Sequence, residues 1–190
     1  ATAGCTALQA LRDRGRLTAG QAVLVIGASG GVGSLAVAVA AQLGAQVTGV
    51  CGAAAAELVR SLGASSILVR GQDPLARRAE RFHVVFDAAA AHSYGELGHL
   101  LHPGGVYVTT LPSLGLITAM PRARLAGKRA AFINVKSRRA DLEQLATWVG
   151  GGMKLAIDST YPVREVGKAI ARAAQGGMRG RVIIDVAGGF

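Results

Sequence analysis

The stretch that most constrains the fold is a glycine-rich turn between an apolar run and an alanine-rich segment. The apolar run is residues 23–26, the turn is residues 27–33, and residues 34–43 have the composition of a buried helix. A strand, a tight glycine turn and a helix in this order are typical of dinucleotide-binding sheets. Ala28, Gly30 and Gly33 have the A-x-G-x-x-G spacing, so the turn predicts a dinucleotide site.

The physical basis is the close approach of a phosphate to the backbone. Gly30 and Gly31 lack a Cβ, which lets a pyrophosphate come close. The helix that begins near Gly31 directs free N–H groups and its positive dipole end at that phosphate. Gly33 lets the helix pack tightly on the strand. The alternative is a glycine-rich turn that binds no ligand.

Length and composition indicate one domain, or one domain with an appendage, because 190 residues with 51% hydrophobic content can bury a core. No apolar run reaches the roughly 18 residues of a membrane span, and residues 1–20 lack the layout of a secretory signal. Cys5 and Cys51 are far apart and support neither a disulfide framework nor a zinc cluster. We expect small buried thiols in a reducing cytoplasm.

The net charge of +10 raises the alternative of nucleic-acid binding. Aromatic residues make up only 4% of the chain, no recognition motif is present, and the basic residues are scattered, with concentrations at 77–81 and 122–139. We therefore expect a solvated basic face. Attraction of an anionic cofactor is the next interpretation, and nucleic acid is the third.

Strands and helices alternate along residues 1–136. Together they predict an α/β fold, a doubly wound parallel Rossmann sheet with helices on both faces. Residues 111–129 are expected to be irregular, residues 102–105 to turn, and Asp73 to cap the fourth helix. The expected strands are 23–26, 46–51, 66–69, 83–87, 106–110 and 130–135; the expected helices are 2–14, 34–43, 54–62, 74–81 and 93–101.

The character of the sequence changes after Lys136. An amphipathic helix is expected at 141–149, an extended pair at 161–162, a helix at 164–175 and a strand at 181–186. The last strand follows a complete six-strand set, so we expect it to pair elsewhere. The predicted division is a dinucleotide-binding domain at 1–136 and a helix–helix–strand segment at 137–190.

Six ordered motifs resemble one known family. They are AGCTALQAL at 3–11, GASGGVG at 27–33, VVFD at 84–87, LHPGG at 101–105, IDSTYPV at 157–163 and GRVII at 180–184. Together they resemble the medium-chain dehydrogenase/reductase superfamily, and within it the zinc-independent, quinone-oxidoreductase-like branch. The resemblance implies an NADPH-dependent reductase that moves a hydride between nicotinamide and a quinone, enone or carbonyl substrate.

The resemblance also bears on what this chain contains. Full-length members carry a GroES-like catalytic domain before the dinucleotide-binding domain, and residues after Lys136 correspond to the segment that returns to it. The chain is therefore expected to be a fragment, a cleaved product or one piece of a larger enzyme, and its isolated activity is in question. Members commonly form homodimers through the edge of the sheet, which assigns residues 101–116 as a candidate interface.

The second strand bears on the choice of cofactor. NAD-specific domains carry an acidic side chain at its end, which binds the adenosine ribose. Here Cys51 and Gly52 stand at that position and no carboxylate follows until Glu57, which favours NADP(H) over NAD(H). A 2′-phosphate needs cationic partners. Arg70, where relatives often place a tyrosine, is the first candidate; Arg60 is the second, with a solvated helix residue as its alternative role.

The resemblance assigns further cofactor contacts. Thr6 matches a threonine that abuts the nicotinamide, and Arg181 is either a basic residue that reaches the pyrophosphate or a surface charge. Asp87 is either part of the site or a structural acid that caps a neighbouring loop. The residues assigned to the pyrophosphate are Ser29, Gly30, Gly31 and Val32. Those assigned to the path from adenosine to nicotinamide are Ala88, Ala89, Thr109, Thr110 and Phe132.

No metal and no proton donor are expected. Thr2 and Ala3 stand where metal-dependent relatives carry a cysteine ligand, and the histidines at 83, 92, 99 and 102 have no metal-ligand spacing. Two other functions stay open: a non-catalytic NADP(H)-binding module, and a basic protein that binds nucleic acid.

Overall fold

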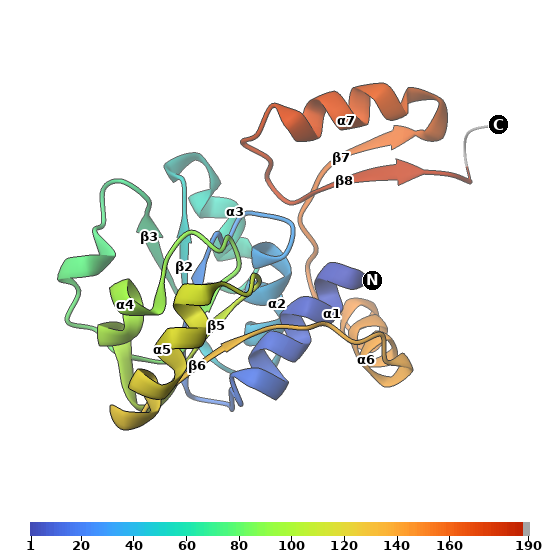
Figure 1. Cartoon of the computed structure of the whole chain (residues 1–190). Helices are drawn as coiled ribbons and strands as arrows, with labels where there is room; N and C mark the ends of the chain where they lie inside the picture. Colours follow the sequence, from blue (N-terminus) through green and yellow to red (C-terminus); the bar gives the residue numbers. More distant parts are fainter. Residues whose placement is uncertain (188–190) are drawn as a thin grey trace.

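The computed structural model, which describes residues 1–187, has a six-stranded parallel sheet as its main body (Figure 1). The strand order is β3-β2-β1-β4-β5-β6, the order of a doubly wound dinucleotide-binding sheet. This confirms the predicted Rossmann architecture. The strands are β1 (Ala22–Ile26), β2 (Gln46–Cys51), β3 (Ser66–Val69), β4 (Phe82–Asp87), β5 (Leu101–Thr109) and β6 (Arg129–Phe132).

Helices cover both faces of this sheet because alternate residues of its strands are apolar on each side. In β1, Val23 and Val25 belong to one buried cluster, whereas Leu24 and Ile26 belong to the other. The first cluster includes side chains of α1 (Thr2–Leu8), η1 (Gln9–Arg14), α2 (Gly33–Gln42) and α3 (Ala56–Ser61). The second includes side chains of α4 (Tyr94–Leu97) and α5 (Leu114–Leu125). Short 3₁₀ turns complete the connections: η2 (Ala53–Ala55), η3 (Leu75–Arg77) and η4 (Gly98–Leu100).

The register of the sheet determines where loops meet. Ile26, the last residue of β1, pairs with Val50 of β2 on one side and with Asp87 of β4 on the other. The carboxyl ends of three strands therefore lie side by side. The connections leave in opposite directions from β1 and β4, which creates the crevice where open α/β sheets bind ligands.

Two predicted elements on the second face are wrong. Instead of a helix over 74–81, only η3 forms, and Asp73 does not cap it: its Oδ2 accepts the N–H of Val69 at 2.8 Å. The segment 111–129, expected to be irregular, contains the twelve-residue helix α5. Ser113 caps α5 by accepting the N–H of Leu116 at 3.1 Å, and Pro121 lies inside the helix.

β5 also differs from the prediction. It begins at Leu101, which pairs with Phe82, and the next pair is Val106 with Val84. Residues 102–105 therefore bulge within the strand instead of forming a separate turn. β5 pairs with β4 and, through residues 106–109, with β6, so residues 106–109 are not an edge. The edge on this side is β6, and it ends at Phe132, earlier than predicted.

The C-terminal part forms a separate βαβ unit. β7 (Ile157–Pro162) and β8 (Arg181–Asp185) pair in parallel as their own sheet, joined by η5 (Val163–Glu165) and α7 (Val166–Ala174). The final strand thus pairs outside the main sheet, as predicted, whereas most of β7 was not predicted. In Figure 1 this unit stands beside the main body, and α7 covers one face of its sheet. Residues 188–190 of the predicted C-terminal segment lie outside the described residues.

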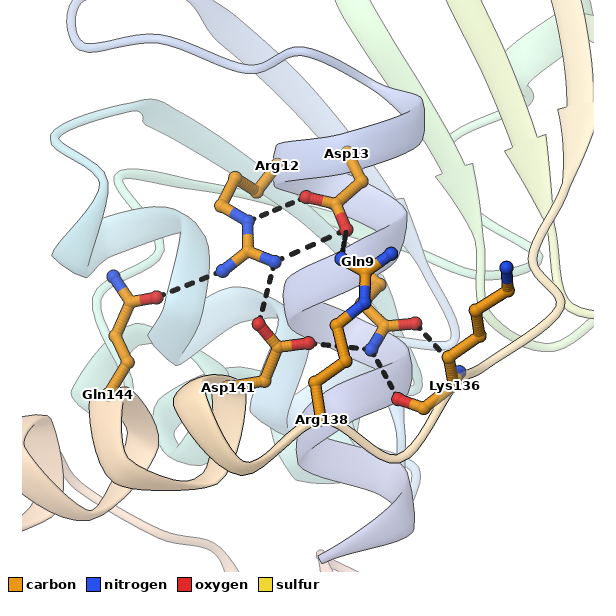
Figure 2. A network of polar contacts seen from close by, with 7 residues as sticks. All are labelled: Gln9, Arg12, Asp13, Lys136, Arg138, Asp141 and Gln144. Atoms are coloured by element: carbon orange, nitrogen blue, oxygen red, sulfur yellow. Dashed lines mark hydrogen bonds and ion pairs between the residues drawn. The ribbon is translucent and has the colours of Figure 1, made fainter.

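Polar contacts join α6 (Arg139–Gly150) to the first helix (Figure 2). Gln9 donates to Oδ2 of Asp141 at 2.6 Å and to the carbonyl of Lys136 at 2.7 Å. Arg12 donates to Oδ1 of Asp141 at 2.7 Å and to Gln144 at 3.0 Å. Gln9, Arg12 and Asp13 belong to η1, so we call these residues, with Arg138, the η1–α6 network; it fixes the chain where it leaves the main sheet.

Candidate cofactor site

The glycine loop between β1 and α2 has a conformation that requires glycine at two positions. Gly27 has a φ of +75°, and a Cβ there would lie 2.9 Å from Cβ of Ala89. A Cβ on Gly33 would lie 2.0 Å from the carbonyl oxygen of Gly27. Inside the loop, the N–H of Gly30 donates to that same oxygen at 2.9 Å. The loop is thus a compact turn with its backbone close to the surface.

A cleft of about 410 Å³ opens at the carboxyl ends of β1, β2, β3 and β4. Its walls include the turn after β1, the end of β2, the loop after β3 and the loop after β4. Five residues that the sequence assigned to the cofactor line it: Ser29, Cys51, Gly52, Arg70 and Ala89. Residues from four strand ends that are distant in sequence therefore share one cavity.

The other loop residues lie beside this cleft, under the C-terminal βαβ unit. The N–H of Gly180 donates to the carbonyl oxygen of Ser29 at 3.0 Å. A Cβ on Gly31 would lie 3.5 Å from Nη1 of Arg181. Gly30, Gly31 and Val32 are half-buried. The structure thus brings the Arg181 guanidinium to the glycine loop, next to the predicted position of the pyrophosphate.

The two candidate arginines for a 2′-phosphate have different surroundings. Arg60 donates to the carboxylate of Glu57 at 2.5 Å. The Arg70 side chain is exposed, lines the cleft, and has no ion pair or hydrogen bond with any residue the structure describes. Burial raises the pKa of the Cys51 thiol between them, and the two nearby arginines oppose that rise, so Cys51 is a neutral thiol at pH 7.

Asp87 has the structural role that the sequence left open. It is fully buried, and its Oδ2 accepts the N–H of His92 at 2.8 Å, so it holds the loop after β4. The Tyr107 hydroxyl lies 3.4 Å from the same oxygen and donates to the His92 carbonyl at 2.6 Å. Burial, followed by the Asp87 charge, raises the pKa of Tyr107.

The remaining predicted contacts lie away from the cleft. The Thr6 hydroxyl is buried and donates to the carbonyl of Thr2 at 2.9 Å. Thr109 lines a separate cavity of about 210 Å³ next to Tyr107. Phe132 packs on the second apolar cluster, and Ala88 and Thr110 are half-buried. Their contact with a nicotinamide stays a prediction.

Sequence reasoning missed part of the cleft wall. The missed residues belong to the connections that follow β3 and β4, including η3 and α4. Their position after the carboxyl end of a parallel strand is the signal that would have identified them. They are Gly71, Asp73, Pro74, Leu75, Ala76, Ala91, His92, Glu96 and Leu97.

Neither a metal cluster nor a membrane-spanning helix is found within residues 1–187. No group of three or more His, Cys, Asp or Glu side chains in that range could hold a metal ion, whereas a zinc site needs three or four protein ligands. None of the helices in the same range is both long and apolar enough to cross a bilayer.

The chain is similar to several known oxidoreductases. Residues 62–184 match the family described as zinc-binding dehydrogenase. The trans-enoyl reductase pgmF of Aspergillus terreus (strain NIH 2624 / FGSC A1156) is 28% identical over 208 residues, covering 98% of this chain and 57% of that protein. The mitochondrial NAD(P)H oxidoreductase RTN4IP1 of Mus musculus is 28% identical over 191 residues, covering 88% and 48%.

A solved structure extends this likeness to the fold. The quinone oxidoreductase from Coxiella burnetii superposes with a TM-score of 0.82 at 25% identity, covering 97% of this chain and 58% of that one. The chain spans about half the length of the curated relatives it matches.

Proposed function

Because the chain belongs to the zinc-binding dehydrogenase family, as the nucleotide-binding part of a medium-chain dehydrogenase/reductase, we propose that it binds NADP(H) for an oxidoreductase. The observation that carries this proposal is the cleft at the strand ends. Its walls include the glycine loop, Cys51 and Gly52 at the end of β2, and the exposed side chain of Arg70.

The residues of the cleft fit a dinucleotide. A Cβ on Gly52 would have no neighbouring atom within 4 Å, so open space lies where an acidic side chain would bind the ribose of NAD. The Arg70 guanidinium can donate two parallel hydrogen bonds to a phosphate. On the other side of the loop, Arg181 adds positive charge beside Gly31. Both ends of an adenosine diphosphate unit would therefore meet cations.

In this arrangement, different residues would contact different parts of the cofactor. When bound, the nicotinamide supplies or accepts the hydride. The loop N–H groups and Arg181 would hold the pyrophosphate, and Arg70 would hold the 2′-phosphate. A contact between Thr6 and the nicotinamide rests on the family resemblance alone, because the buried Thr6 hydroxyl is bonded to the carbonyl of Thr2. We assign no proton donor among these residues. We assign no substrate pocket within residues 1–187.

We propose a quinone or another conjugated carbonyl compound as the substrate. The names of a quinone oxidoreductase and a trans-enoyl reductase among the similar proteins support this class. Both names refer to acceptors with an activated double bond. We further propose that the reaction is zinc-independent, since Thr2 and Ala3 stand where metal-dependent relatives carry a ligand. Cys5 and Cys51 are free and buried, which suits a cytoplasmic location.

A titration of the purified chain with NADPH and NADH, followed by nicotinamide fluorescence, tests the cofactor proposal. Arg70→Gln removes charge-assisted bonds to the 2′-phosphate, so NADPH affinity should fall by about tenfold or more, while NADH affinity stays within about twofold. Arg60→Gln, a neighbouring arginine already paired with Glu57, is the matched control and should leave both affinities unchanged. Equal affinities for the two cofactors in the unmodified chain would contradict NADP(H) selectivity.

We also propose a homodimer, formed through β6 rather than through β5. Among the described strands β6 pairs only with β5, and it presents its other edge to a second copy. Leu114 and Ile117 of α5, which packs on β6, are exposed large apolar side chains. Sedimentation velocity should give the mass of two chains, and a monomer at every concentration would contradict the proposal.

A further inference from the structure

A second large cavity lies at the opposite end of the main sheet from the cofactor cleft. It has a volume of about 710 Å³ and is lined by Arg16, Arg124, Lys128 and Arg129 together with uncharged residues. We call it the basal cavity. Arg129 begins β6 and Arg16 precedes β1, so this is the amino end of the strands. An adjoining cavity of about 340 Å³ shares Arg16 and Arg129 and adds His83.

The charges of the basal cavity are uncompensated by the residues that the structure describes. None of the side chains that line either cavity is acidic. Within residues 1–187, the side chains of Arg16, Arg124 and Arg129 form no ion pair or hydrogen bond, and Lys128 donates only to the carbonyl of Gly98, at 2.8 Å. Helix carboxyl ends favour cations, but each end supplies only roughly half an elementary charge. α5 and η1 end here, so four cations exceed what those two ends can neutralise.

The walls of the cavity are fixed by backbone contacts. The N–H of Gly104 donates to the carbonyl of Gly127 at 2.6 Å, and the N–H of Lys128 donates to Ala123 at 2.8 Å. Arg16 has a φ of +55°, an uncommon conformation for a residue with a side chain, and it lies between the buried residues Gly15 and Leu17. The cations therefore project from a rigid frame instead of from a loose loop.

We propose that the basal cavity binds an anion with two or more adjacent phosphate groups, at a site distinct from the cofactor cleft. Arginine forks match phosphate oxygens in bidentate geometry, and three arginines with a lysine can serve several phosphates at once. A small oligophosphate is favoured over nucleic acid. The described lining of the two cavities contains no Phe, Tyr or Trp, whereas single-stranded nucleic-acid sites stack bases on aromatic rings.

Calorimetric titration with inorganic tripolyphosphate, at fixed ionic strength and in the presence of saturating NADPH, tests the site. Arg124→Gln should weaken tripolyphosphate binding by about tenfold. Arg122→Gln is the matched control: it removes the same charge from the same last turn of α5 but from a residue outside both cavities. It should change the affinity by less than about twofold. Circular dichroism checks that both variants stay folded.

Three results would overturn the proposal. Absence of heat at any tripolyphosphate concentration shows that no such site exists. Equal weakening by Arg122→Gln and Arg124→Gln shows attraction by net charge alone. Tighter, Arg124-dependent binding of a single-stranded oligonucleotide assigns the cavity to nucleic acid. If NADPH does not bind, the same comparison of variants without it still separates this cavity from the cofactor cleft, where Arg70→Gln is the corresponding variant.

Discussion

At Gly33 the packing of the sheet and the shape of the proposed phosphate site depend on the absence of one methyl group. α2 begins at Gly33, and a Cβ there would overlap the carbonyl oxygen of Gly27, at 2.0 Å. A backbone oxygen cannot move aside as the end of a flexible side chain can. The helix would have to move away from β1, and its free N–H groups would move with it.

Gly33→Ala should therefore lower both stability and cofactor affinity. We expect the free energy of unfolding to fall by roughly 1–3 kcal/mol, as in overpacked cores, measured by urea denaturation. Gly167→Ala in α7 is the control because open space surrounds that position, and alanine favours the helix by about 0.5–1 kcal/mol. Unchanged stability of Gly33→Ala would show that the loop can shift without cost.

Individual site residues were predictable where sequence position alone determines their place. Cys51, Gly52 and Arg70 stand at the ends of strands in a parallel sheet, so the fold brings them to one edge. Thr6 and Phe132 were assigned by resemblance, and the cleft does not reach them. His92 and Glu96 were missed because they belong to a loop whose course depends on Asp87, and no local pattern describes the hydrogen bond that holds it.

Between elements, the η1–α6 network is a polar connection of the C-terminal part to the main body (Figure 2). Asp141 is 2% exposed and bonds to Gln9 and Arg12. Burial tends to raise the pKa of this carboxyl, but the hydrogen bonds from Arg12 and Gln9 outweigh it and the pKa is lowered. The carboxylate is therefore held charged, with both oxygens satisfied.

Asp141→Asn should loosen α6 from the first helix. Loss of hydrogen bonds to a charged partner costs roughly 1.5–3 kcal/mol, so the urea midpoint should fall accordingly. Glu143→Gln is the control, since this side chain is exposed and pairs with Arg139 on its own helix; exposed pairs of this kind contribute at most about 0.5 kcal/mol. Equal effects of the two substitutions would mean that the network adds nothing to stability.

The strands of the main sheet were predictable, whereas β7 and some of the helices were not, for physical reasons. β1 and residues 84–86 of β4 are continuous apolar runs, which are typical of central parallel strands. α5 was missed because Pro121 and Gly115 normally oppose a helix interior; its Ser113 cap and the packing of Leu116 and Ala123 compensate. The helix expected at 74–81 does not form because Asp73, its expected cap, instead bonds to Val69 and Arg78.

Across the whole molecule, two buried carboxylates tie the C-terminal part together. Asp158 accepts the backbone N–H of Arg179 at 2.8 Å and two bonds from Arg172, at 2.7 and 2.9 Å. The Arg179 bond is the largest cause of its lowered pKa. Asp141 has the same role between η1 and α6.

Acid should therefore weaken this protein. Each of these carboxyl groups has a lower pKa in the folded state than in the unfolded state. Its contribution to stability is therefore complete above the unfolded pKa of about 3.9, and it disappears as the pH falls through the folded pKa. Thermal unfolding followed between pH 7 and pH 3 should show a falling Tm below about pH 4. The double variant Asp141→Asn, Asp158→Asn should show a shallower fall, and identical pH profiles would exclude these two groups as the cause.

The bond from Gly180 to Ser29 joins residues about 150 positions apart, and this separation has a consequence for biosynthesis. At 5–20 residues per second, roughly 8 to 30 seconds pass between translation of the first partner and of the second. During that interval the nascent glycine loop has neither Gly180 nor Arg181 beside it. A nascent chain that ends just before Gly180 would thus have all six strands of the main sheet but a crevice still open on one side, because the segment that closes that side is made after the sheet.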